Sequence, residues 1–68
     1  MVAYEIETGE MDDGSWAYIL HANEVGPRGI IYLGEDGHGS GFADLDEAMK
    51  AAAERLDEWY GKGCWKRL

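Results

Sequence analysis

The strongest constraint on the fold is the amphipathic segment of residues 42–61. Asp44 followed by Glu47 has the spacing of a capping box, and Gly61 suits the left-handed residue just beyond a helix C-terminus. Between these signals, apolar residues recur every three or four positions, as one face of a helix requires: Leu45, Ala48, Met49, Ala52, Leu56, Trp59 and Tyr60. An isolated helix of this length is marginal in water. The rest of the chain must therefore supply a surface that covers this apolar stripe.

The first half of the chain is predicted to supply that surface as three strands. Residues 2–8 alternate between apolar and polar, residues 15–23 are rich in aromatic and aliphatic side chains, and residues 30–33 form a short β-branched run. Asp13-Gly14 is a strong turn signal, and the glycine-rich residues 34–41 are predicted to be a loop that leads to the helix. Strands joined by short loops favour an antiparallel meander. The predicted fold is a single α+β domain over residues 1–68, with a three-stranded antiparallel sheet and one C-terminal helix on one of its faces.

The two faces of the predicted sheet differ in how well the sequence defines them. Glu5 and Glu7 fall on a face that the helix leaves uncovered. The second strand is partly apolar on both sides, so Trp16 and Tyr18 are either core residues or exposed anchors for a partner. Trp65, in the basic tail of residues 62–68, is too large to be left in solvent, and the tail is predicted to fold back onto the core.

Charge is the one functional signal in this sequence. The net charge of −8 comes from residues 1–49, which carry eleven acidic residues against Arg28 alone, whereas residues 50–68 sum to +2. A field of this sign repels nucleic-acid phosphates and anionic membranes, and it attracts basic surfaces. A role in solubility alone fits the same charge. The single cysteine, Cys64, and the absence of a signal peptide or a long apolar run predict a cytoplasmic protein.

No pattern in the sequence predicts catalysis or a cofactor. His21, His38 and Cys64 lack the spacing of metal ligands. The glycine-rich segment matches neither the dinucleotide nor the Walker pattern, and acidic residues surround it. Ser15 and Ser40 have no evident activating base. Lys62, Lys66 and Arg67 could lower the pKa of the Cys64 thiol, but a structural or incidental cysteine is the favoured interpretation. The chain is therefore predicted not to be an enzyme and to bind no metal or cofactor.

Two family resemblances rest on the helix and the strands. Residues 39–56 resemble the end of a double-stranded RNA-binding domain, but Asp44, Asp46 and Glu47 stand where that family presents phosphate-binding lysines, so no direct nucleic-acid binding is expected. The whole chain resembles the N-terminal part of HicB-type antitoxins. That likeness lies in the opening strand, in Asp13-Gly14 before an aromatic strand, and in a helix that starts near residues 46–48 and reaches Trp59. It implies a module that neutralises a small basic toxin.

A third resemblance is one of type. Small size, acidic charge and the lack of catalytic motifs are similar to phage-encoded anti-CRISPR proteins, which implies a DNA mimic that binds a basic subunit of a CRISPR–Cas effector. The predicted contacts are the acidic residues Glu5, Glu7, Glu10, Asp12, Asp13, Glu24, Glu35 and Asp36. The protein is expected to be a monomer or a weak homodimer. The open alternatives are the antitoxin module and a homodimer built through the bare sheet face or an edge strand, with no inhibitory role.

Overall fold

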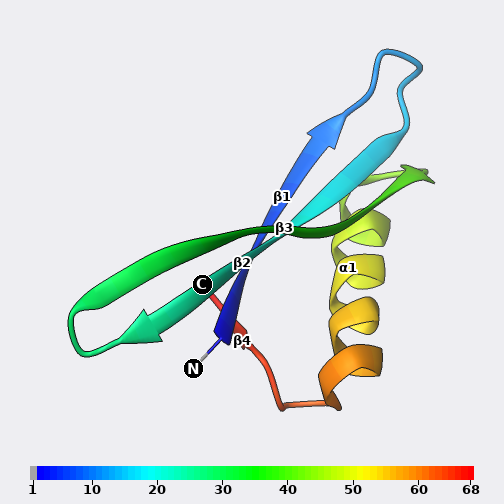
Figure 1. Cartoon of the computed structure of the whole chain (residues 1–68). Helices are drawn as coiled ribbons and strands as arrows, with labels where there is room; N and C mark the ends of the chain where they lie inside the picture. The colour runs from blue at the N-terminus through cyan, green and yellow to red at the C-terminus, as the bar shows by residue number, and fades with distance from the viewer. Residues whose placement is uncertain (1) are drawn as a thin grey trace.

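The computed structural model describes residues 2–68, in which four strands form one sheet and a helix lies across one of its faces (Figure 1). The elements are β1 (Val2–Glu10), β2 (Trp16–Gly26), β3 (Gly29–Phe42), α1 (Leu45–Tyr60) and β4 (Lys66–Arg67). The strand order is β3-β2-β1-β4, and β1, β2 and β3 form the predicted antiparallel meander. The α+β class is confirmed. The prediction of a purely antiparallel, three-stranded sheet is wrong, because β4 adds a parallel strand beside β1.

The parallel strand β4 was missed because it is only two residues long and carries no alternating pattern. After α1 the chain turns back along the sheet, and the register pairs Ala3 with Lys66. The Leu68 N–H continues this pairing by donating a hydrogen bond to the Tyr4 carbonyl at 2.8 Å. Trp65 packs against the core, and its indole N–H donates to the Asp57 carboxylate at 2.8 Å. The prediction that the tail folds back is confirmed.

The glycine-rich segment is a strand and not a loop. β3 runs from Gly29 to Phe42, so residues 34–41 continue the strand that the sequence predicted to end at residue 33. Its glycines allow close packing against large side chains. A Cβ on Gly39 would lie 2.6 Å from Tyr18 Cε2, and a Cβ on Gly37 would lie 3.2 Å from Trp59 Cη2. Packing of the Tyr18 ring thus requires glycine at position 39, and packing of Trp59 favours it at position 37, a demand that strand propensity does not reveal.

The helix begins and ends where the sequence predicts. The Asp44 carboxylate accepts a hydrogen bond from the Glu47 N–H at 2.8 Å, and the Glu47 carboxylate accepts from the Ala43 N–H at 2.9 Å. Gly61 has a φ of +93° and its N–H donates to the Asp57 carbonyl. The buried stripe is narrower than predicted, however. Ala48, Ala52 and Leu56 are buried, whereas three predicted members, Leu45, Trp59 and Tyr60, are more than 40% exposed.

The core lies between α1 and one face of the central strands. Tyr4 of β1, together with Tyr18, Leu20 and Ala22 of β2, packs against Ala52 and Leu56 of the helix. Tyr18 is therefore a core residue, whereas Trp16 is half-buried. Because side chains alternate along a strand, the odd-numbered residues of β1 and β2 face away from α1.

The sheet extends well beyond the helix, and the molecule measures 42 × 23 × 15 Å. Figure 1 shows the β2–β3 hairpin projecting away from α1 on one side, while the β1–β2 turn lies at the opposite end of the sheet. Among residues 2–68, no helix is long and apolar enough to cross a membrane.

Candidate functional site

Three of the eight predicted contact carboxylates lie together on the face of the sheet opposite α1. Glu5 and Glu7 are two residues apart on β1, so their side chains leave the same face. The register pairs Glu5 with His21 of β2, and His21 with Glu35 of β3, which sets these three residues in one row. Since neighbouring strands are about 4.8 Å apart, Glu5 and Glu35 are separated by about 10 Å across the row. We name Glu5, Glu7, His21, Tyr32 and Glu35 the acidic face.

A line of hydrogen bonds joins three members of the acidic face across three strands. His21 Nε2 lies 3.0 Å from Glu7 Oε1, and His21 Nδ1 lies 2.9 Å from the Tyr32 hydroxyl. A carboxylate only accepts, so Nε2 carries a proton, and in the neutral ring Nδ1 accepts the hydroxyl proton of Tyr32. The His21 side chain is only 16% exposed, whereas Glu7 is 61% exposed. The histidine thus holds an outward carboxylate and an outward phenol in fixed positions.

Sequence reasoning did not include His21 and Tyr32 in the site. Tyr32 is 57% exposed, and its ring packs on that of His21 with a centroid separation of 5.7 Å. An aromatic ring held in place on an exposed surface is typical of residues that anchor a partner. A signal for His21 was present in the sequence: a hairpin turn centred on Asp13 pairs residues whose numbers sum to 26, which places His21 opposite Glu5.

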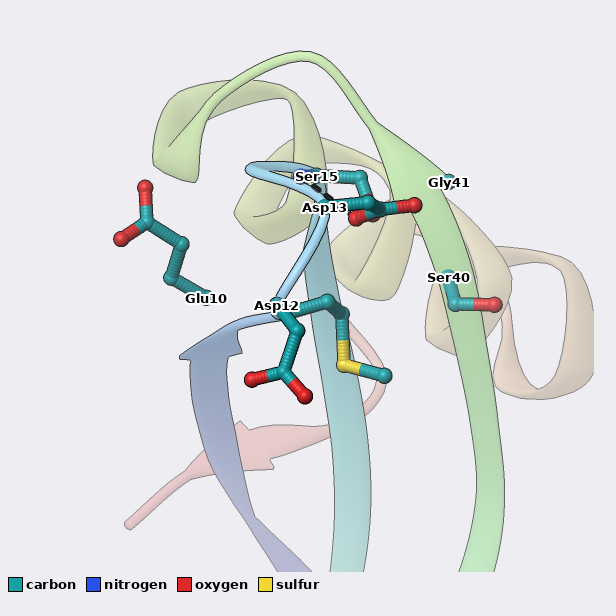
Figure 2. A pocket seen from close by; sticks show the side chains of 7 residues that line it. Glu10, Asp12, Asp13, Ser15, Ser40 and Gly41 are labelled. Carbon is teal, nitrogen blue, oxygen red and sulfur yellow. Dashed lines mark hydrogen bonds between the residues drawn. The ribbon is translucent and has the colours of Figure 1, made fainter.

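The second group of predicted residues lies in the β1–β2 turn. Glu10, Asp12 and Asp13 line an open hollow of about 530 Å³ that also includes Ser40 and Gly41 of β3. Figure 2 shows that Glu10 points away from Asp13, so the carboxylates do not converge on one point. The Asp13 carboxylate accepts hydrogen bonds from the Ser15 hydroxyl at 2.6 Å and from the Ser15 N–H at 2.9 Å. These two bonds lower the pKa of Asp13. They also direct its carboxylate toward the backbone of its own turn.

The last two predicted residues lie on the helix side of the sheet. Asp36 is an extra residue where the β2–β3 register shifts, and its carboxylate accepts a hydrogen bond from the Tyr4 hydroxyl at 2.6 Å. The Tyr60 hydroxyl is also within hydrogen-bonding distance of the Tyr4 hydroxyl. Glu24 is half-buried near the end of β2, opposite Ile31 of β3. The structure therefore separates Glu35 and Asp36, although they are neighbours in the sequence.

The Tyr4 hydroxyl gives a testable pH dependence. Burial and the bond to Asp36 raise the pKa of Tyr4 far above its usual value of 10. A tyrosine in the unfolded chain ionises near pH 10 while the folded chain keeps the proton, so this contribution to stability is full below pH 10 and falls as the pH rises further. We expect Tyr4→Phe to lower the free energy of unfolding by about 1 kcal/mol at neutral pH.

Urea unfolding between about pH 8 and pH 11 measures this effect, with the exposed Tyr32→Phe as the matched control. The native protein and Tyr32→Phe should lose stability more steeply above pH 10 than Tyr4→Phe does. Equal slopes for all three proteins would show that Tyr4 is not held protonated by its surroundings.

Comparisons with known proteins add no template for the site. No protein-family model matches the chain, and no curated protein or solved structure shows significant similarity to it. Within residues 2–68, no three histidine, cysteine or acidic side chains are grouped as metal ligands would be. The chemistry of the site therefore rests on its own geometry, which is a carboxylate-bearing sheet face with a tyrosine held against His21 at one side.

Proposed function

We propose that the protein is a non-enzymatic inhibitor that binds, through its acidic face, a basic nucleic-acid-binding surface of a CRISPR–Cas effector complex. The observation that carries this proposal is the row of Glu5, His21 and Glu35 across three strands, with Glu7 beside it. On this surface three carboxylates project from paired strands, and the Glu7 carboxylate is held by His21. Lysine and arginine side chains that normally hold phosphates would meet carboxylates there, and target DNA would be kept out.

The distribution of charge over the molecule supports binding to a basic partner. Glu10 and Asp12 are exposed residues at the β1–β2 turn, at one end of the same sheet. Their carboxylates extend the negative electrostatic potential beyond the acidic face. Over the central part of the sheet, the opposite face is covered by α1. With a net charge of −8, the whole molecule is steered toward a positive groove before contact forms.

Small size, acidity and the lack of a catalytic pattern favour a CRISPR–Cas effector as the partner, because these features resemble those of anti-CRISPR proteins. The inhibitor would then act in the cytoplasm of the bacterial host. A small basic toxin, the partner of an antitoxin-like module, would meet the same face through the same chemistry. The two partners differ in size and in their affinity for DNA, so one experiment separates them.

Charge reversal on the acidic face tests the proposal. Glu5→Lys with Glu7→Lys should weaken partner binding by at least about 100-fold, because two contacts to basic side chains become repulsive. Both residues are exposed, so the fold should survive, as circular dichroism would show. The matched control is Glu54→Lys with Glu58→Lys on the exposed side of α1, which changes the net charge equally but should retain binding.

The measurement is capture of an effector complex from lysate on the immobilised protein, followed by identification of its subunits. Binding should weaken between about 50 mM and about 500 mM NaCl and should be displaced by target DNA. Equal binding by the acidic-face variant and the α1 control would exclude the acidic face as the contact surface. Capture of one small basic protein, insensitive to DNA, would replace the effector with a toxin as the partner.

A further inference from the structure

The far end of the β2–β3 hairpin exposes more apolar surface than a solvated strand needs. Ile30, Ile31, Tyr32 and Leu33 are consecutive in β3 and are 56–66% exposed. This segment is on the outer edge of the sheet, since the strand order ends at β3. Figure 1 shows that α1 lies away from this hairpin end, so the helix covers neither face of it. Natural edge strands usually carry charges, proline or β-bulges. Residues 29–33 contain no charge and no proline, and their one irregularity is the register shift at Leu33.

We propose that this edge pairs with the same edge of a second copy, which joins two sheets into one eight-stranded sheet. The two β3 strands would run antiparallel and be related by a two-fold axis normal to the sheet. In such a pair, each residue must lie opposite a residue of the second copy whose side chain is on the same face of the joined sheet. A register centred on Ile31 meets this condition: Ile31 faces its own copy, and Ile30 faces Tyr32 of the second copy. Ile30 and Tyr32 both lie on the face away from α1, because they pair with Val25 and Asn23. We call this line of contact between the two β3 strands the seam. Apolar side chains of the two copies then meet on both faces of the joined sheet.

Charge complementarity favours this register and a second copy as the occupant. Leu33 is an extra residue at a register shift, so Glu35 is three ladder positions from the centre. The two Glu35 side chains are therefore about 20 Å apart along the strands, beyond the range of their mutual repulsion in physiological salt. Arg28, the one basic residue of residues 1–49, lies in the hairpin turn just outside the pairing. It comes next to Glu35 of the second copy at both ends of the seam. The β3 edge therefore carries both the positive charge of Arg28 and the negative charge of Glu35 that would pair across the seam.

The dimer does not depend on the proposed inhibitory function. If that function is correct, the dimer would present two acidic faces to the partner. A two-fold axis normal to the sheet keeps both acidic faces on the same side of the joined sheet. The two functions respond to salt in opposite directions. Each copy carries a charge of −8, so raising the salt concentration screens repulsion between copies and should tighten the dimer, whereas it should weaken binding to a basic partner.

Sedimentation equilibrium of the purified protein at about 50 mM and about 500 mM NaCl measures the association. We expect a monomer–dimer equilibrium that shifts toward dimer at high salt. Ile31→Lys should weaken the dimer at least about tenfold, because two lysines then face each other at the axis. Met11→Lys is the matched control, since Met11 is 49% exposed at the opposite end of the sheet and should leave dimerisation unchanged.

A charge exchange keeps the proposal testable if Ile31→Lys fails to fold. Arg28→Glu and Glu35→Arg should each weaken the dimer, and the double variant should restore it, because each pair across the seam is then opposite in charge again. A protein that stays monomeric at all accessible concentrations would overturn the proposal. A dimer that Ile31→Lys and the charge reversals leave intact would also overturn it, since the contact would lie elsewhere.

Discussion

Leu56→Ala should destabilise the fold by about 2–5 kcal/mol, which is the range for truncating a fully buried leucine. Leu56 is completely buried, and Leu20 and Tyr4 are the other largest side chains that are fully buried. Much of the rest of the core between α1 and the sheet is alanine: Ala22, Ala48 and Ala52. Small neighbours cannot move in to fill the space that Leu56 leaves, so the cavity should persist. At about 0.05–0.15 kcal/mol per residue, the whole domain has only about 3–10 kcal/mol of stability to lose.

Thermal and urea unfolding followed by circular dichroism measure this loss. A domain of this size shifts its Tm by about 4–8 °C per kcal/mol, so we expect a fall of at least about 8 °C. Leu45→Ala is the matched control, because it makes the same change in the same helix at a residue that is 41% exposed. Equal losses for the two variants would mean that α1 is not held on the sheet through Leu56.

The local signals in this sequence predicted the helix well because its ends are fixed by local chemistry. Asp44, Glu47 and Gly61 act within one or two turns of the backbone, so they can be read without knowing what packs nearby. The strand β4 depends instead on where the chain returns after α1. Lys66 and Arg67 carry no pattern of their own, and only their contact with β1 makes them a strand.

The candidate site shows the same limit. The alternation of β1 is enough to predict that Glu5 and Glu7 share an open face. Glu35 and Asp36 could not be separated from the sequence, because the residues around them read as a loop and the register shift at Asp36 comes from pairing with β2. The grouping of Glu5, His21 and Glu35 is a product of strand register, which links residues that are up to 30 positions apart.

Gly39→Ala, in the glycine-rich part of β3, should destabilise the fold by about 1–3 kcal/mol. The new Cβ would lie 2.6 Å from Cε2 and 2.8 Å from Cζ of Tyr18. The Tyr18 ring cannot easily move aside. It is 4% exposed, stacks on Phe42 with a centroid separation of 5.7 Å, and accepts a hydrogen bond from Arg55 at 3.2 Å. The clash should therefore be relieved only by separating β3 from the ring.

Gly9→Ala is the matched control for this prediction, because a Cβ on Gly9 would meet nothing within 4 Å. Neither glycine has a positive φ, so the two substitutions differ in packing and not in backbone strain. Gly9→Ala should be neutral or stabilise by up to about 1 kcal/mol, since alanine restricts the unfolded chain more than glycine does. If Gly39→Ala also proved neutral in urea unfolding, β3 would not lie against Tyr18, and the glycine-rich segment would be the flexible loop that its composition suggests. A loss confined to Gly39→Ala would instead show that Gly39 leaves room for the Tyr18 ring, a role that it has only when β3 is paired with β2.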